Sequence, residues 1–182
     1  MHSYQMSPVA TLMEQELITQ WNRLVGFTTD SQTGDGVIVS GGSQANLIAM
    51  MMARHQAYSE IKTKGFGHQA LVAFVSDQAH YSVQKAANVL GIGTDNLIAV
   101  ASDNEGRLCP IALTQAIELS IEQGHKPFFI GLTAGTTVFG TFDPVTECRA
   151  IADQHNLWLH IDGAWGAPRI VFTGVQTFVK GL

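Results

Sequence analysis

The fold is decided by the stretch Leu71-Val72-Ala73-Phe74-Val75, which runs directly into Ser76-Asp77-Gln78-Ala79-His80. Consecutive apolar residues predict a strand that is covered on both faces, because a strand with one face in water alternates apolar and polar residues. Such strands belong to parallel sheets flanked by helices. The polar residues that follow then lie at the edge of the sheet where ligands bind in this architecture.

Apolar runs of the same kind recur on both sides of this stretch, separated by segments with helical spacing. We expect strands at 37–39, 71–75, 97–100, 128–132 and 157–161, and helices at 43–58, 80–90, 110–122 and 143–155. Strands that alternate with helices predict a three-layer α/β/α domain with a mostly parallel sheet. Asp143 is expected to cap the last of these helices, and Pro144 is expected in its first turn.

The N-terminal segment is expected to form a separate helix. Ser7 is a suitable N-cap, Pro8 suits the first helical position, and Gly26 is expected to end the helix. We therefore divide the chain into residues 1–35, a helix with a connecting loop, and residues 36–182, the sheet-containing domain. Trp21 and the Met50-Met51-Met52 block are expected in the core, since methionine fills irregular gaps.

The composition excludes some classes of protein. Hydrophobic residues make up 46% and charged residues 14% of the 182, which excludes a disordered chain. The net charge is −5 and no basic stripe occurs, so we expect neither nucleic acid nor a membrane as a partner. Residues 1–10 lack the features of a signal peptide. Only two cysteines, Cys109 and Cys148, are present, and we expect a reducing compartment and a cytoplasmic location.

Four polar clusters follow the expected strands. They are Ser40-Gly41-Gly42-Ser43, Ser76-Asp77-Gln78-Ala79-His80, Thr133-Ala134-Gly135-Thr136-Thr137 and Asp162-Gly163-Ala164. Because the carboxyl ends of parallel strands share one edge of a sheet, we expect these clusters to meet there.

The first cluster fits a phosphate site. Its glycines allow close approach of the backbone, and the first turn of a helix offers unpaired N–H groups to which Ser43 adds a hydroxyl. A tight turn followed by an ordinary N-cap explains the same residues.

The second and third clusters each have two interpretations. His80 suits stacking on an aromatic ring, proton transfer or metal binding, but also a polar residue satisfied locally at a helix start. Thr136 and Thr137 suit donation to a phosphate or a ring substituent, but turns use the same residue types.

The fourth cluster places a carboxylate at the end of an apolar strand. Asp162 there requires a partner, and a protonated pyridine nitrogen is one that fits, while a helix cap or an ion pair is the alternative. A metal site would need His80, His160 and Asp162. We expect no metal, because no open-site motif such as His-Glu-x-x-His occurs.

In this order and spacing, the four clusters resemble the group II pyridoxal-phosphate-dependent decarboxylases, most closely the glutamate and cysteine-sulfinate decarboxylase branch. The resemblance runs from Tyr4 to about Pro168, and the segments that carry it are 40–47, 76–82, 135–144 and 157–166. It implies the large domain of the fold type I enzymes, which resembles aspartate aminotransferase, and pyridoxal 5'-phosphate as cofactor. It also implies an amino-acid substrate, an acidic one by the branch, and a homodimer.

The resemblance assigns a role to six residues. Gly42 and Ser43 would hold the cofactor phosphate, and Thr137 would contact the cofactor beside its ring. His80 would stack on the pyridine ring and assist protonation, Asp162 would pair with the ring nitrogen, and Ala164 would pack against the other face of the ring.

The family's anchoring lysine lies downstream of the strand that carries Asp162, and Lys180 does not match its motif. We therefore expect that lysine beyond Leu182, together with the rest of the large domain and the small domain. On this interpretation the chain is a fragment with weak or no turnover. An aminotransferase or lyase of the same fold, and a non-catalytic module that binds cofactor or dimerises, are the alternatives.

Overall fold

The structure is a computed structural model that describes residues 4–27, 35–67 and 69–168. It divides into two compact units. Gly41–Ala167 forms the larger unit, and the described residues of the smaller one are 4–27, 35–40 and 168. Each unit is described by itself below.

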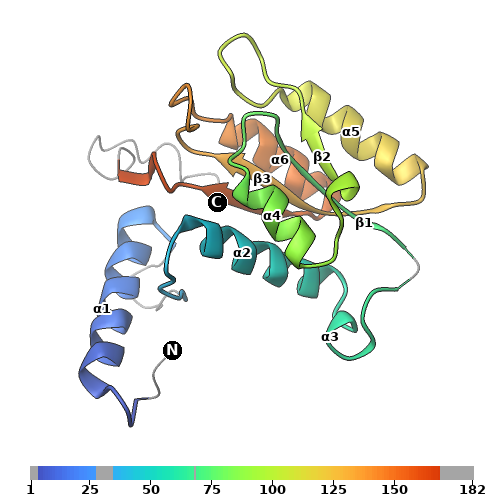
Figure 1. Ribbon diagram of the computed structural model, residues 1–182. Coiled ribbons are helices and arrows are strands. Elements are labelled where there is room, and N and C mark those ends of the chain that lie inside the picture. The colour runs from blue at the N-terminus through green and yellow to red at the C-terminus, as the bar shows by residue number, and fades with distance from the viewer. Residues whose placement is uncertain (1–3, 28–34, 68, 169–182) are drawn as a thin grey trace. The chain divides into compact units, whose positions relative to one another are not determined.

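The larger unit is built on a parallel sheet of four strands in the order β2-β1-β3-β4 (Figure 1). The strands are β1 (Leu71–Ser76), β2 (Leu97–Val100), β3 (Lys126–Thr133) and β4 (Trp158–Asp162). All three neighbouring pairs are parallel, and Thr133 pairs with Asp162 at the carboxyl ends of β3 and β4. The sequence prediction of a parallel sheet is confirmed.

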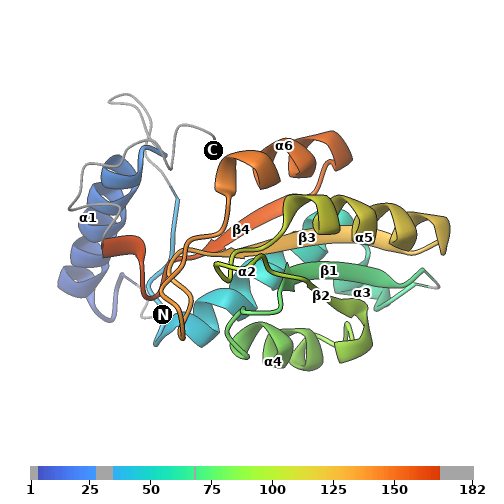
Figure 2. The same ribbon diagram turned by 90° about the horizontal axis from the view of Figure 1, so that it is seen from above.

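Helices cover both faces of this sheet (Figure 2). On one face lie α2 (Gly42–Ala57) and α4 (Ser82–Val89), and on the other lie α5 (Pro110–Glu122) and α6 (Val145–His155). The short helices α3 (Ile61–Lys64) and η1 (Thr94–Asn96) were not expected from the sequence. The predicted three-layer α/β/α architecture is confirmed.

Only one residue of the Met50-Met51-Met52 block lies in the core between the sheet and α2, although all three were predicted there. Met50 is fully buried and packs in the cluster that contains Ala73, Val75 and Val83. Met51 and Met52 are 42% and 50% exposed. Successive helical residues point about 100° apart, so only one of three neighbours can face the sheet.

Asp143 does not have the predicted capping role. The N-cap of α6 is Pro144, and no side chain caps that helix. The Asp143 carboxylate is buried and accepts hydrogen bonds from the backbone N–H groups of Leu108 and Thr133, each at 2.7 Å. It therefore connects two loops to the end of β3 instead of starting a helix.

The smaller unit contains α1 (Pro8–Val25), which begins and ends as predicted, with Gly26 at φ 81° as its C-cap. Trp21 is 48% exposed, so its prediction as a core residue is wrong. The strand expected at 37–39 is also absent, since these residues have no regular secondary structure. The N–H of Ile38 donates to the Glu14 carboxylate on α1 at 3.1 Å, and a strand needs a neighbouring strand to take that bond.

In the parts of the chain that the structure describes, no helix is both long enough and apolar enough to cross a bilayer.

Candidate cofactor site

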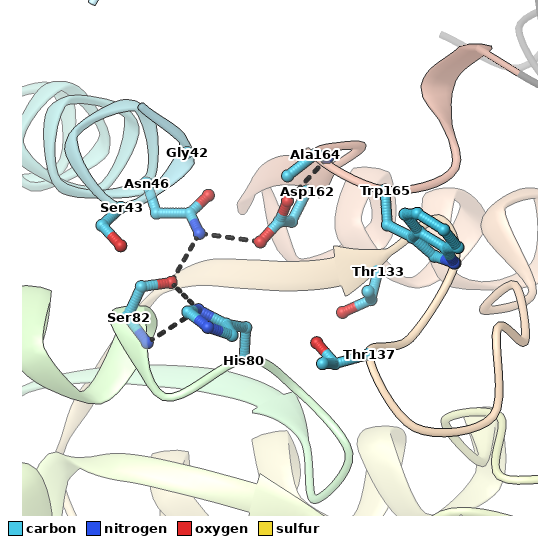
Figure 3. Close-up of a pocket in the computed structure, with 11 residues that line it drawn as sticks. Gly42, Ser43, Asn46, His80, Ser82, Thr133, Thr137, Asp162, Ala164 and Trp165 are labelled. Carbon is cyan, nitrogen blue, oxygen red and sulfur yellow. Dashed lines mark hydrogen bonds between the residues drawn. The ribbon is translucent and has the colours of Figure 1, made fainter. Parts of the chain in front are cut away.

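A cavity of about 300 Å³ opens at the carboxyl ends of the strands, within the larger unit (Figure 3). Its size lies at the lower end of the range for small-molecule sites, roughly 300–1,000 Å³. It is lined by Gly42, Ser43, Asn46, His80, Ser82, Thr133, Gly135, Thr137, Asp162, Ala164 and Trp165. All six residues assigned from the sequence, Gly42, Ser43, His80, Thr137, Asp162 and Ala164, are among them.

The first turn of α2 forms one wall of the cavity. The helix begins at Gly42, and the N–H groups of Gly42 and Ser43 lie where no carbonyl of the same helix can pair with them. A Cβ on residue 42 would stand 3.2 Å from the Cβ of Ala164, tighter than ordinary contact. Glycine at this position therefore lets the β4 end and the helix start approach one another.

His80 lies between β1 and α4, two residues before the helix begins. Its Nδ1 is 2.8 Å from the Ser82 hydroxyl and accepts the Ser82 backbone N–H at 3.2 Å. The helix start thus holds one ring nitrogen of His80, and the prediction of a locally satisfied polar group is correct in part. The same imidazole also lines the cavity, so the two interpretations of His80 do not exclude one another.

Asp162 is the last residue of β4 and is half-buried. Its Oδ1 accepts the backbone N–H of Ala164 at 3.0 Å, and its Oδ2 accepts a hydrogen from the Asn46 side chain at 2.8 Å. No ion pair holds this carboxylate among the residues that the structure describes. The alternative of a salt bridge is therefore not supported, and the carboxylate is oriented by neutral donors.

The two threonines after β3 have different places. Thr136 is buried, and its hydroxyl pairs with Thr141 across the loop at 2.9 Å. Thr137 is exposed and lines the cavity. The turn explanation therefore holds for Thr136, whereas Thr137 is in position to contact a group in the cavity.

The three residues that a metal site would need, His80, His160 and Asp162, do not all line the cavity. His160 does not line the cavity, because its Nε2 bonds to the Asn46 side chain at 2.8 Å and its ring stacks on Phe129. Burial lowers the pKa of the His160 imidazole from its ordinary value of 6.5. Across residues 4–27, 35–67 and 69–168, no three or more His, Cys, Asp or Glu side chains are grouped to hold an ion.

Asn46, Ser82, Thr133 and Trp165 also line the cavity, although the sequence analysis gave them no role. Helical spacing offered a signal for Asn46, because it follows Gly42 by four residues and so lies on the same face of α2. Asn46 and Ser82 are 3% and 2% exposed, a burial that polar residues reach only when their hydrogen bonds are satisfied.

The fold and the cavity define a class of protein: a parallel α/β domain with a small-molecule site at its strand ends, where a helix start, an imidazole and a carboxylate converge. The model of the pyridoxal-dependent decarboxylase conserved domain matches residues 1–182. The chain belongs to this family.

Curated relatives and solved structures agree with this membership. The chain is 40% identical to the cysteine sulfinic acid decarboxylase of Rattus norvegicus and 38% identical to the human acidic amino acid decarboxylase GADL1, in both cases over its whole length. It covers 36% and 34% of these two proteins, about a third of their length.

The crystal structure of mouse CSAD in apo form superimposes with a TM-score of 0.92 at 38% identity, over 99% of this chain and 37% of that one. The structure of Oryza sativa TDC with PLP and tryptamine superimposes with a TM-score of 0.87 at 26% identity, over 98% of this chain and 38% of that one.

Proposed function

We propose that this chain forms the larger part of a pyridoxal 5'-phosphate site in a decarboxylase of acidic amino acids. The observation that carries the proposal is the meeting, in one cavity, of the α2 start with the His80 imidazole and the Asp162 carboxylate. These groups come from segments up to 120 residues apart on the chain, counted from Gly42 to Asp162. Each of them matches a different part of the cofactor.

The phosphate end fits the first turn of α2. Gly42 and Ser43 offer backbone N–H groups and a hydroxyl at the positive end of the helix dipole, the usual setting for a bound phosphate. Thr137 adds a second hydroxyl from the loop after β3.

The ring end fits the part of the cavity that Asp162, His80 and Ala164 line. Asp162 is the one carboxylate among the described lining residues, and its two bonds leave acceptor capacity for a protonated ring nitrogen. His80 lines the cavity as a flat imidazole, and Ala164 presents only a methyl group. When bound, the cofactor supplies a ring that accepts the electron pair released by loss of carbon dioxide, and Asp162 favours the protonated ring that does so. No lysine is found among the described lining residues.

The proposed substrate is an acidic amino acid. The support is that the relatives named above are a cysteine sulfinic acid decarboxylase and an acidic amino acid decarboxylase. The test is carbon dioxide release by the whole protein from cysteine sulfinate, glutamate and aspartate, compared with tryptophan and tyrosine. Amine with carbon dioxide supports a decarboxylase, whereas a keto acid contradicts it and indicates an aminotransferase.

Cofactor binding is tested directly on the chain. Pyridoxal phosphate is titrated into the protein, and quenching of tryptophan fluorescence reports its arrival, because Trp165 lines the cavity. Asp162→Asn keeps the shape of the side chain but removes its charge. A charge-assisted hydrogen bond contributes about 1.5–3 kcal/mol, so we expect affinity to fall roughly ten- to a hundredfold.

The matched control is Asp95→Asn, which removes an exposed carboxylate outside the cavity and should leave affinity unchanged. Pyridoxal without its phosphate should bind more weakly than the complete cofactor. Equal binding of pyridoxal phosphate to the native chain and to Asp162→Asn would contradict the assignment of the ring nitrogen to Asp162.

We also propose a homodimer and a cytoplasmic location. The dimer is supported by α1, on which Val9, Leu12, Met13, Leu17, Trp21 and Leu24 are 48–69% exposed. The location is supported by Cys109 and Cys148, which are both free thiols. Analytical ultracentrifugation and cell fractionation test the two proposals.

A further inference from the structure

Asn46, on α2, connects three groups that come from two other elements of the larger unit, α4 and β4. Its Nδ2 lies 2.8 Å from the Asp162 Oδ2 and 2.9 Å from the Ser82 Oγ (Figure 3). Its Oδ1 lies 2.8 Å from the His160 Nε2. Asn46 and Ser82 are both buried. Water therefore does not take the place of these partners, and the direction of each hydrogen bond is determined within the protein.

The orientation of the Asn46 amide follows from Asp162. A carboxylate only accepts hydrogen bonds, so the NH₂ group of Asn46 faces it, and the opposite orientation would place oxygen against oxygen. Both amide hydrogens are then used, one on Asp162 and one on Ser82. The Asn46 Oδ1 is left as an acceptor, so the His160 Nε2 carries a hydrogen and donates to it.

The same reasoning continues through Ser82 to His80. The Ser82 backbone N–H donates to the His80 Nδ1, so Nδ1 is an acceptor and carries no proton. The Ser82 Oγ already accepts from Asn46 and lies 2.8 Å from that same Nδ1. Its own hydrogen therefore points to Nδ1, and the proton of the imidazole lies on Nε2.

We propose that Asn46 and Ser82 are positioning residues that hold the His80 imidazole in the Nε2–H tautomer. Through their hydrogen bonds, this tautomer depends on the Asp162 carboxylate. A group bound in the cavity then meets an imidazole that donates from Nε2, with its other nitrogen already engaged. The consequence for a bound cofactor depends on the function proposed above, whereas the tautomer itself does not.

The test is the tautomer of His80 in the ligand-free full chain, read from long-range ¹H–¹⁵N spectra of protein labelled with ¹⁵N-histidine. Single His→Gln variants assign the signals. We expect His80 and His160 each to show a protonated Nε2 and an unprotonated Nδ1. A protonated Nδ1 on His80 in the native chain overturns the proposal without any further variant.

Asn46→Asp provides the sharper test, because it exchanges the donor for an acceptor of the same shape. The new carboxyl lies against the Asp162 carboxylate, and the pair shares one proton. The Ser82 hydroxyl then turns to donate to the oxygen that replaces the Asn46 Nδ2, and the Ser82 oxygen favours a hydrogen on the His80 Nδ1. We expect a new population of the Nδ1–H tautomer. An unchanged tautomer in this variant overturns the proposal.

The double variant Asn46→Asp with Ser82→Ala separates the hydrogen-bond chain from a general effect of the added charge. Without the hydroxyl the two residues are no longer linked, so His80 should return to the Nε2–H form. If the double variant shows as much Nδ1–H as Asn46→Asp alone, the chain through Ser82 is refuted. Ser82→Thr, which keeps the hydroxyl, should behave as the native protein does.

The spectra need no cofactor, so the two proposals fail separately. Absence of pyridoxal phosphate binding would refute the proposed function and leave the tautomer result standing. A normal titration with pyridoxal phosphate alongside an unaltered His80 tautomer in Asn46→Asp would refute only the role of the two positioning residues. The His125 signals serve as an internal reference, because that residue does not line the cavity.

Discussion

Asp143 and Thr133 are joined by a hydrogen bond in which the Asp143 Oδ2 accepts the backbone N–H of Thr133 at 2.7 Å. Thr133 is the last residue of β3 and lines the cavity. The other oxygen of Asp143 accepts the N–H of Leu108 at the same distance. One buried carboxylate thus fixes the end of a central strand to the loop that precedes α5.

Replacing Asp143 by asparagine should destabilise the protein although the shape is kept. Both carboxylate oxygens accept from N–H groups, and an amide offers one acceptor and one NH₂, which would face another donor. An unsatisfied buried donor costs about 1–3 kcal/mol, and we expect a loss of that size in the free energy of unfolding. Urea denaturation followed by circular dichroism measures it.

Asp153→Asn is the matched control for this variant. Asp153 is on the exposed side of α6 and pairs with Arg149 at 2.8 Å. Exposed pairs contribute about 0–1 kcal/mol, so this change should have little effect on the urea midpoint. Equal losses in the two variants would show that the double acceptor at Asp143 has no special role.

The convergence of the site at one edge of the sheet could be predicted from the sequence. His80, Thr137 and Asp162 each follow an apolar strand, and parallel strands bring such positions together whatever their separation along the chain. Local patterns suffice for this, because strand ends and helix starts are marked by neighbouring residues.

The hydrogen bonds inside the site could not be predicted in the same way. Asn46 and Asp162 are 116 residues apart, and nothing near either residue indicates the other. The predicted capping role of Asp143 was wrong for a related reason. An Asp-Pro pair before a helix is typical of a cap, and only the packed structure shows that the backbone N–H groups of Leu108 and Thr133 bind its oxygens instead. The strand predicted at residues 37–39 was wrong for the same reason, because a strand-like pattern does not show whether a partner strand lies beside it.

Gly135 should tolerate no side chain. Its φ is +87°, and an added Cβ would stand 2.9 Å from Trp165 Cδ1 and 3.0 Å from the Gly166 backbone. We expect Gly135→Ala to lower the free energy of unfolding by about 2–5 kcal/mol, from backbone strain together with overpacking. Thermal unfolding measures the loss.

Gly124→Ala separates the two causes. Gly124 has a similar φ of +77°, but a Cβ there would meet nothing within 4 Å. This variant should show the backbone cost alone, about 1–2 kcal/mol. If both alanine variants lose the same stability, then Trp165 and Gly166 do not restrict position 135.

The two cysteines should differ in reactivity. Cys148 is buried on α6, and burial raises the pKa of its thiol to about 12, whereas Cys109 is half-buried. The thiolate is the reactive form, so a thiol reagent such as DTNB should label Cys109 first in the native protein. Cys109→Ser should remove this early labelling, and Cys148 should react only when urea unfolds the chain. Early labelling that persists in Cys109→Ser would contradict the burial of Cys148.

Stability should fall on mild acidification because of His160. Its pKa in the folded protein lies below 6.5, so the unfolded chain takes up a proton that the folded chain resists. Stability from this residue is complete above pH 6.5 and is lost as the pH drops through that value towards the folded pKa. The urea midpoint should therefore decrease between about pH 7.5 and 5.5.

His160→Gln isolates this contribution, because glutamine does not titrate and still has an N–H to donate to the Asn46 Oδ1. The decrease in the urea midpoint should be smaller in this variant. Asp143 has the opposite effect on the free energy of unfolding. Burial raises the pKa of its carboxyl above the ordinary 3.8, so the folded chain holds this proton more readily than the unfolded chain, and stability from this residue rises as the pH falls. That effect is present in both proteins and cancels in the comparison. Parallel pH profiles for the native chain and His160→Gln would therefore show that the imidazole of His160 is free to take up a proton in the folded state.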